Sequence, residues 1–137
     1  MAFEFPIRIY WEDTDAGGIV FYANYLKFFE RARTEWLRAL GIHQRQLREQ
    51  CGGMFVVADA GLKYLRPARL DDELIVTARL QEAGRAGMVL AQQAFLAGAT
   101  PADRTLLCDG RIRAGWVDAQ TMKPARIPSD ILQKLDP

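Results

Sequence analysis

The chain has 137 residues, half of them hydrophobic, which is enough for one globular domain with its own core, residues 1–137. Its formal net charge of +1 gives no basic excess for binding nucleic acid. No apolar run approaches the roughly 20 residues that span a bilayer, and the N-terminus lacks the residue order of a signal peptide. We therefore expect a cytoplasmic protein with no stable membrane insertion.

The first segment alternates apolar and polar side chains from Phe3 to Trp11, which predicts a half-buried strand. Pro6 lacks a backbone N–H, so it favours a place at the edge of a sheet. An acidic turn follows from Glu12 to Gly18. Its two glycines, Gly17 and Gly18, are free to take positive φ.

A helical period of 3.6 residues replaces the alternation from about Tyr22 to Leu40. The residues on its predicted apolar face are Tyr22, Tyr25, Leu26, Phe29, Ala32, Trp36 and Leu40. Gly41 stands where a left-handed C-terminal cap belongs. Arg33 lies inside the apolar arc, so we expect either an ion pair with Glu30 or a contact across a subunit interface.

The remainder of the chain is mostly strand. A short helical turn over 44–50 precedes strands predicted at 54–64, 73–81, 88–97 and 106–117, and Ser129 can cap a last helix over 130–135. The predicted order is one strand, one long helix, then four strands in hairpin-like succession, which is an α+β fold. One helix can hardly cover five strands, so we expect the protein to associate with itself.

Several common catalytic groups are scarce or absent. Ser129 is the only serine and lacks a nucleophile-elbow motif, and His43 is the only histidine. Cys51 and Cys108 have no zinc-site spacing, and glycine-rich nucleotide motifs are missing. We interpret His43 as a surface residue and both cysteines as reduced structural thiols. If the protein is an enzyme, a carboxylate is the best candidate for its chemistry.

The best-placed carboxylate is Asp15, the last acid of EDTD, just before the predicted helix. By residues alone it is either a cap of the glycine amides or a reactive group. The second reading is chemically coherent because free N–H groups at a helix start can hold a developing oxyanion. Glu12 and Asp13 could instead join Asp15 as metal ligands, but no further ligands are evident, so we expect no metal or cofactor.

Two long motifs carry a family resemblance. EDTDAGGIVFYANYLKFFERARTEWL and YLRPARLDDEL, with the late MKPARIP segment, resemble the YbgC-type, Tol–Pal-associated acyl-CoA thioesterases. These belong to the 4-hydroxybenzoyl-CoA thioesterase group of hotdog folds. The resemblance covers nearly the whole chain. It implies a five-stranded antiparallel sheet wrapped around one long central helix, a homodimer with active sites at its interface, and often a homotetramer.

The resemblance also implies roles for individual residues. The catalytic acid falls on Asp15, as general base or nucleophile, and the backbone N–H that polarises the thioester falls on Tyr22. Close YbgC relatives commonly carry His at the place of Tyr22, but a backbone donor does not depend on the side chain. Gly18 and Asn24 are candidates for contact with substrate, and Asn24 could instead cap the helix or orient Asp15.

The substrate implied is an acyl-CoA. The apolar side chains that suggest a pocket for its acyl group are Phe21, Tyr22, Met54 and Phe55. Arg66, Arg69 and Arg85 lie in predicted turns and are candidates for binding the phosphates and adenosine of CoA, although ordinary solvated arginines would look the same. Two other functions stay open. One is a non-catalytic acyl-CoA-binding module, which would not need Asp15. The other is a hotdog hydratase or dehydratase, which would need a histidine near that acid.

Overall fold

The computed structural model describes residues 2–135. Its helices are α1 (Asn24–Ala39), α2 (Gln44–Cys51) and α3 (Ser129–Leu135). Its strands are β1 (Phe3–Arg8), β2 (Gly53–Tyr64), β3 (Glu73–Ala83), β4 (Gly87–Leu96) and β5 (Thr105–Asp118). Two 3-10 turns, Trp11–Asp13 and Pro101–Asp103, complete the set. Within the described residues, no helix is both long and apolar enough to cross a membrane.

The five strands form one antiparallel sheet in the order β1-β3-β4-β5-β2. This confirms the α+β prediction, and β1 lies at an edge as Pro6 indicated. The hairpin-like succession is wrong at one step, because β2 pairs with β5 and not with β3. Between Tyr64 and Glu73 the chain therefore crosses from edge strand β2 to β3, which lies beside the opposite edge strand β1.

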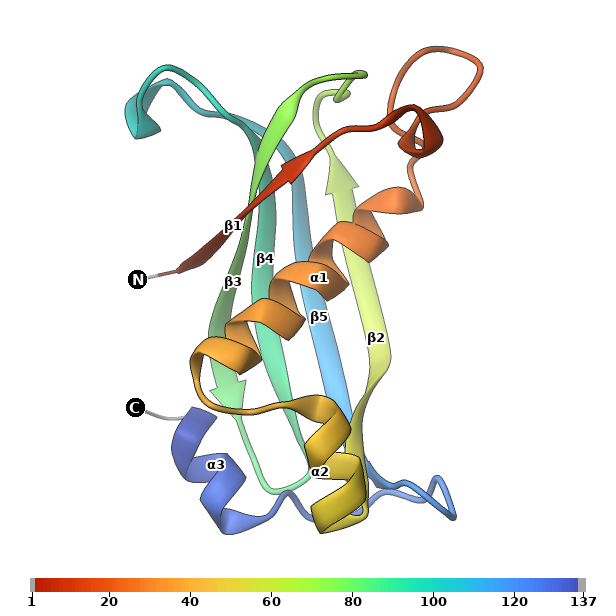
Figure 1. The fold of residues 1–137 in the computed structure, drawn as a ribbon, viewed down its shortest axis with the longest axis vertical. Helices are drawn as coiled ribbons and strands as arrows, with labels where there is room; N and C mark the ends of the chain where they lie inside the picture. The colour runs from red at the N-terminus through yellow and green to blue at the C-terminus, as the bar shows by residue number, and fades with distance from the viewer. Residues whose placement is uncertain (1, 136–137) are drawn as a thin grey trace.

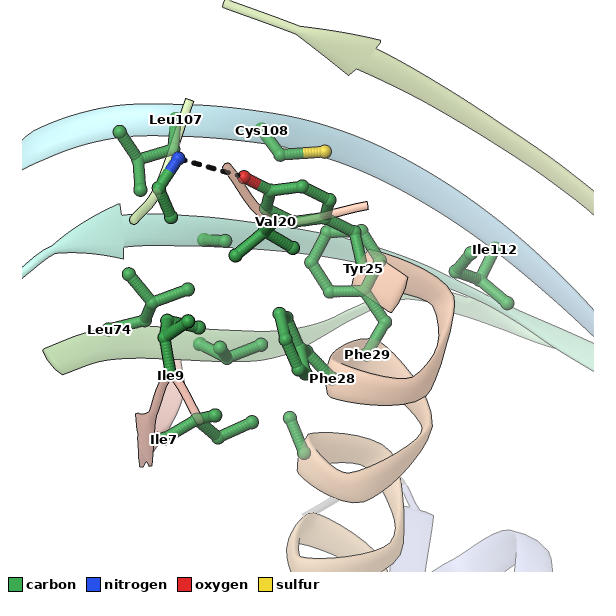
Figure 2. Close-up of a cluster of buried hydrophobic side chains, with 14 residues drawn as sticks. Ile7, Ile9, Val20, Tyr25, Phe28, Phe29, Leu74, Leu107, Cys108 and Ile112 are labelled. Carbon is green, nitrogen blue, oxygen red and sulfur yellow. Dashed lines mark hydrogen bonds between the residues drawn. The ribbon is translucent and has the colours of Figure 1, made fainter. Parts of the chain in front are cut away.

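Helix α1 lies diagonally across one face of the sheet (Figure 1). Its Phe28, Phe29 and Ala32 are fully buried against residues of β3, β4 and β5 such as Leu74 and Ile112. Figure 2 shows this cluster, in which the Tyr25 hydroxyl oxygen accepts a hydrogen bond from Ala68 N–H at 3.4 Å. Burial of this apolar face is what fixes the helix against the sheet.

A second cluster fills the other half of the helix–sheet interface. It brings Trp36 and Leu37 of α1 together with Trp116 of β5 and with Ile131 of α3. Gly41, at φ 81°, ends α1 in the left-handed conformation that the sequence predicted. The long helix is thus anchored along its whole length, and its first turn lies at one end of the sheet.

The first strand ends earlier than its alternating pattern predicted. Pairing with β3 stops at Arg8, and Trp11 is 81% exposed in a 3-10 turn rather than buried in a strand. Ile9 N–H bonds to the Asp72 carbonyl, and Tyr10 N–H then bonds to the Asp13 carboxylate. These contacts replace the strand ladder and turn the chain toward the helix.

The helix also differs from its prediction at the start. It begins at Asn24 rather than Tyr22, and Tyr22 and Leu26 are exposed at 64% and 43%. Phe28 and Leu37, outside the predicted apolar face, are buried instead. The core-facing stripe is therefore rotated from the predicted one, because the sheet meets the helix from a direction that periodicity does not define.

Candidate active site

A tight loop joins the 3-10 turn to the helix and carries Asp15. Residues 14–20, here called the 14–20 loop, are closed by an antiparallel bridge between Thr14 and Val20. Asp15 N–H donates to the Ile19 carbonyl at 2.9 Å, and Gly18 N–H donates to the Asp15 carbonyl at 3.0 Å. The backbone around Asp15 is therefore fixed although its side chain is exposed.

The Asp15 carboxylate is held by the glycine beside it. Gly17 N–H donates to Asp15 Oδ1 at 2.8 Å, which leaves Oδ2 directed away from this contact. Of the two glycines, only Gly18 takes positive φ, at 78°. Gly18 therefore serves the turn, where an L side chain would be strained. The turn-cap role of Asp15 is real, and it also restricts the orientation of the carboxylate.

The chain enters α1 immediately after this loop. Phe21 N–H bonds to the Asp13 carbonyl and Asn24 N–H to the Phe21 carbonyl, at 2.9 and 2.8 Å. Among residues 2–135, no protein oxygen accepts the backbone N–H of Tyr22. A free donor at a helix start is an anion-binding feature. Here it lies seven residues from Asp15 in the sequence and directly beyond the closed loop.

Two buried polar residues support this corner. Asn24 and Asp13 are 8% and 5% exposed, and Asn24 Nδ2 donates to Asp13 Oδ1 at 2.9 Å. The predicted local cap by Asn24 is wrong, because its side chain makes no capping bond to the helix. Its amide binds Asp13, not Asp15, and is buried, whereas a contact with substrate stays a prediction. The sequence pattern suggests only a metal-ligand role for Asp13, and its contact with Asn24 is visible only in the fold.

Tyr64, at the end of β2, was also missed. Its hydroxyl donates to the Tyr22 carbonyl at 2.8 Å, and its ring contacts those of Tyr22 and Tyr25 edge-on. Partial desolvation raises the pKa of Tyr64 above its ordinary value. The only sequence signal was an aromatic residue at the end of a strand, which does not reveal a partner 42 positions away.

The three candidate arginines fall in two places. Arg66 and Arg69 lie on the crossover between β2 and β3, and Arg69 forms a bridge with Ile19 of the 14–20 loop. Arg85 lies in the β3–β4 turn, where its carbonyl accepts Ile127 N–H. Because β3 has 11 residues, its two ends are roughly 35 Å apart. One chain thus brings Arg66 and Arg69, but not Arg85, near Asp15.

Arg33 has a different partner from the predicted one. Its Nη1 donates to Oε1 of the fully buried Gln92 at 3.0 Å, and no carboxylate of residues 2–135 lies within ion-pair distance. Burial lowers the pKa of Arg33, and the nearby Glu30 charge opposes that effect. The Glu30 carboxylate instead accepts a hydrogen bond from the Thr34 hydroxyl at 2.8 Å. The expected ion pair is wrong, whereas a contact across a subunit interface stays a prediction.

A cavity of about 370 Å³ opens between α1 and β2 beside Arg33. Its apolar lining includes Leu37, Phe55, Val57 and Met88. Met54 and Phe55 lie near the start of β2, whereas Phe21 and Tyr22 lie near its end, so one chain alone does not bring these four side chains together.

Cys108 is buried in the core cluster that also contains Val20 and Tyr25. Burial raises the pKa of Cys108 to about 12, so its thiol stays protonated and is a poor nucleophile. Cys51 and His43 are exposed near α2. Within the described residues, no group of three His, Cys, Asp or Glu side chains has the geometry of a metal site. The Asp13 carboxylate, which the metal alternative would need, is turned inward and bonded to protein donors.

Comparison with known proteins identifies the family and the fold. A family model described as the thioesterase-like superfamily matches residues 9–135. A 4-hydroxybenzoyl-CoA thioesterase structure superposes with a TM-score of 0.88 at 20% identity, covering 98% of this chain and 99% of that one. A probable thioesterase from Bartonella henselae gives 0.83 at 30% identity, covering 93% and 100%. The fold is therefore that of the hotdog thioesterases, as predicted.

Proteins of similar sequence show which group of hotdog thioesterases the chain belongs to. The chain is 39% identical over 129 residues to the acyl-CoA thioesterase YbgC of Haemophilus influenzae, covering 94% of this chain and 90% of the relative. It is 38% identical over 130 residues to the acyl-CoA thioester hydrolase YbgC of Escherichia coli O6:H1, covering 95% and 92%. The chain belongs to the YbgC family of acyl-CoA thioesterases. This confirms the resemblance drawn from the two sequence motifs.

Proposed function

We propose that this protein hydrolyses acyl-CoA thioesters, with Asp15 as the reacting carboxylate and the Tyr22 N–H as the oxyanion donor. The observation that carries the proposal is the combination of an exposed carboxylate, held by Gly17, with an unoccupied N–H at the adjoining helix start. Thioester hydrolysis needs these two elements, an activated nucleophile and a donor for the carbonyl oxygen.

Two routes use the same residues. As a general base, Asp15 takes a proton from water while the water oxygen attacks the thioester carbon; the C–S bond then breaks, and the CoA sulfur takes up a proton. As a nucleophile, Asp15 attacks that carbon itself, CoA leaves, and water hydrolyses the mixed anhydride. In both routes the Tyr22 N–H stabilises the tetrahedral oxyanion, typically by about 3 kcal/mol for one donor.

We propose that the arginines bind the CoA portion. Arg66 and Arg69 are exposed on the segment that runs beside the 14–20 loop, so they can reach a substrate bound there. Arginine side chains suit phosphate because their N–H groups form paired, charge-assisted hydrogen bonds. Arg85 is too distant within one chain, so its role requires a second protomer.

A homodimer supplies that second protomer. Strand β2 is a free edge of the sheet, 12 residues long, with exposed Val57 and Ala58. Pairing two β2 edges about a two-fold axis would run them antiparallel and bring opposite ends of the two sheets side by side. Arg85 of one protomer would then approach the 14–20 loop of its partner. Pairing of such dimers into a tetramer remains part of the proposal.

The proposal includes a cytoplasmic location and chemistry without a metal. Both cysteines are free thiols, as is usual in a reducing compartment. Full hydrolytic activity after exhaustive chelation is expected for carboxylate chemistry. Activity lost on chelation and restored by one divalent cation would contradict it.

The deciding experiment is the Asp15→Asn variant, assayed by release of free CoA thiol from several acyl-CoAs. The amide keeps an oxygen to accept Gly17 N–H but has neither the charge nor the basicity of the carboxylate. We expect kcat to fall by ~10²-fold or more, with KM little changed and the fold intact. An Arg69→Ala variant is the matched comparison, and it should mainly raise KM.

The alternatives give different results in the same assay. A folded Asp15→Asn protein with near-normal kcat would leave Asp15 only as a turn cap. Wild-type protein that binds acyl-CoA without releasing thiol would identify a binding module. Consumption of an unsaturated acyl-CoA without thiol release would instead indicate a hydratase.

A further inference from the structure

Asp13 is a buried carboxylate that the proposed chemistry does not use. It lies at the end of the 3-10 turn, two residues before Asp15, and is 5% exposed. A carboxylate inside a protein is costly unless hydrogen bonds compensate for its lost hydration. An apolar residue at this position would carry no such desolvation cost. The contribution of Asp13 is therefore to be sought in the hydrogen bonds that it makes.

Asp13 binds three separate parts of the chain. Its Oδ2 accepts Tyr10 N–H at 2.8 Å, from the residue that precedes the 3-10 turn. Its Oδ1 accepts Asn24 Nδ2 at 2.9 Å, from the first residue of α1. Its backbone carbonyl accepts Phe21 N–H at 2.9 Å, in the residue before the proposed oxyanion donor. One residue thus joins the base of the 14–20 loop to both sides of Tyr22.

This arrangement restrains the distance between the two reacting groups. Asp15 follows Asp13 by two residues, and Tyr22 lies between Phe21 and Asn24, which both bind Asp13. Apart from the Asp13 contacts, the loop is linked to the first helical turn through the chain and through Ala68, whose carbonyl accepts Val20 N–H and whose N–H donates to the Tyr25 hydroxyl oxygen. A displacement of about 1 Å at a reacting centre can cost ~10²-fold in rate.

We propose that Asp13 and Asn24 are positioning residues, whose buried hydrogen bond holds the Tyr22 N–H in register with the Asp15 carboxylate. The inference rests on the proposed function of Asp15 and Tyr22. It assigns Asp13 and Asn24 no contact with the substrate, in contrast to the earlier expectation for Asn24.

The test exchanges the two side chains. In Asp13→Asn, position 13 loses its charge and one acceptor, and the Asn24 side chain must rotate to present its amide oxygen if the hydrogen bond between them is to be kept. In Asn24→Asp, two carboxylates face each other in a buried site. In the double variant Asp13→Asn/Asn24→Asp, the amide oxygen at position 13 accepts Tyr10 N–H and its NH₂ donates to the new carboxylate. Both hydrogen bonds are then restored with the same number of charges.

We expect each single variant to lower kcat by ~10-fold or more with KM changed by less than about threefold, since substrate contacts lie elsewhere. The double variant should recover kcat to within about threefold of wild type. Asp130→Asn, at an exposed acid in the first turn of α3, is the matched control and should behave as wild type. Melting curves establish that each protein is folded at the assay temperature.

A second readout does not depend on activity. The ¹H–¹⁵N amide resonances of Gly17 and Tyr22 should shift in the singles and return toward wild-type positions in the double. If Asp13→Asn does not fold, Asn24→Ala replaces it, since it removes only the amide donor and carries the same expectation. Rescue of kcat and of the Tyr22 resonance together would support the positioning role.

Two results would overturn the inference. One is a folded single variant with wild-type kcat and unmoved Tyr22 resonance; the other is a folded double variant no better than the worse single. A wild-type protein without thioesterase activity would instead refute the proposed function. The amide resonances would still decide whether the Asp13–Asn24 contact positions Tyr22.

Discussion

Asp15 and Gly17 touch at the centre of the 14–20 loop, and this contact limits what residue 17 can be. A Cβ placed on Gly17 would lie 3.2 Å from Asp15 Oδ1, closer than ordinary packing, whereas its φ is one that L residues adopt. A side chain at residue 17 would therefore displace the neighbouring carboxylate slightly but would not strain the backbone. At the residue scale, the loop sequence serves the orientation of a single side chain.

We predict that Gly17→Ala lowers kcat by ~10-fold while the melting temperature changes little. The methyl group would push the carboxylate away from the Gly17 N–H without straining the backbone. Thiol-release kinetics and a melting curve measure the two effects separately. Gly115→Ala is the control, because its Cβ would meet nothing closer than 3.9 Å. Unchanged kcat in Gly17→Ala would show that the carboxylate orientation does not limit the reaction.

The active corner is held by elements that are far apart in the sequence. Tyr64 at the end of β2 binds the Tyr22 carbonyl just before α1. The crossover after β2 pairs with the 14–20 loop through the Ile19–Arg69 β-bridge and the Val20–Ala68 hydrogen bond. At the sheet edge, β1 is fastened by Arg104, just before β5, whose guanidinium binds both carboxylate oxygens of Glu4 at 2.6 and 3.0 Å. Strand β1, which leads toward the 14–20 loop, is thus held to the rest of the sheet by this ion pair as well as by its backbone hydrogen bonds to β3.

The Glu4–Arg104 pair predicts a pH dependence of stability. The hydrogen bond from Arg104 lowers the pKa of Glu4 below its ordinary value of 4.5. A carboxyl with a lower pKa in the folded state stabilises the fold above the unfolded pKa, and the contribution is lost as pH falls through the folded value. Glu4→Gln should therefore lower the melting temperature at about pH 7 and have no effect near about pH 2. Equal differences at both pH values would contradict the assignment.

At the scale of the whole molecule, the free edge of β2 and the distant Arg85 have no role within a single chain. Arg85 lies at the end of β3 opposite to the 14–20 loop, while β2 offers a free edge with exposed Val57. A two-fold dimer across β2 would resolve both observations, since it would place Arg85 of one protomer beside Asp15 of its partner. The shared site is therefore testable by mixing subunits.

We predict that heterodimers of Asp15→Asn and Arg85→Ala protomers contain one fully wild-type site. In a shared-site dimer, the intact Asp15 of one protomer and the intact Arg85 of the other would meet. Subunits carrying different affinity tags can be mixed, isolated and assayed. The heterodimer should show wild-type KM with about half the wild-type kcat per dimer. A KM as high as that of Arg85→Ala would mean that Arg85 serves its own chain or no site at all.

Local signals in the sequence were sufficient for the elements and for the candidate acid. Alternation, helical period, Pro6 and Gly41 each act within a few residues, and the predicted sheet, long helix, edge strand and helix end are all present. The turn motif that carries Asp15 is equally local. These features follow from the covalent chain and its nearest neighbours, so they can be deduced without the fold.

Only the tertiary structure decided which distant groups meet. The β2–β5 pairing, the Tyr64–Tyr22 bond, the Arg33–Gln92 bond and the enclosure of Asp13 by Tyr10 and Asn24 all depend on packing. Sequence periodicity gives a helix an apolar side but not the direction from which a sheet approaches it. For the same reason, the sequence identified an acid beside a helix start, while the supports that hold the two together appeared only when the chain was folded.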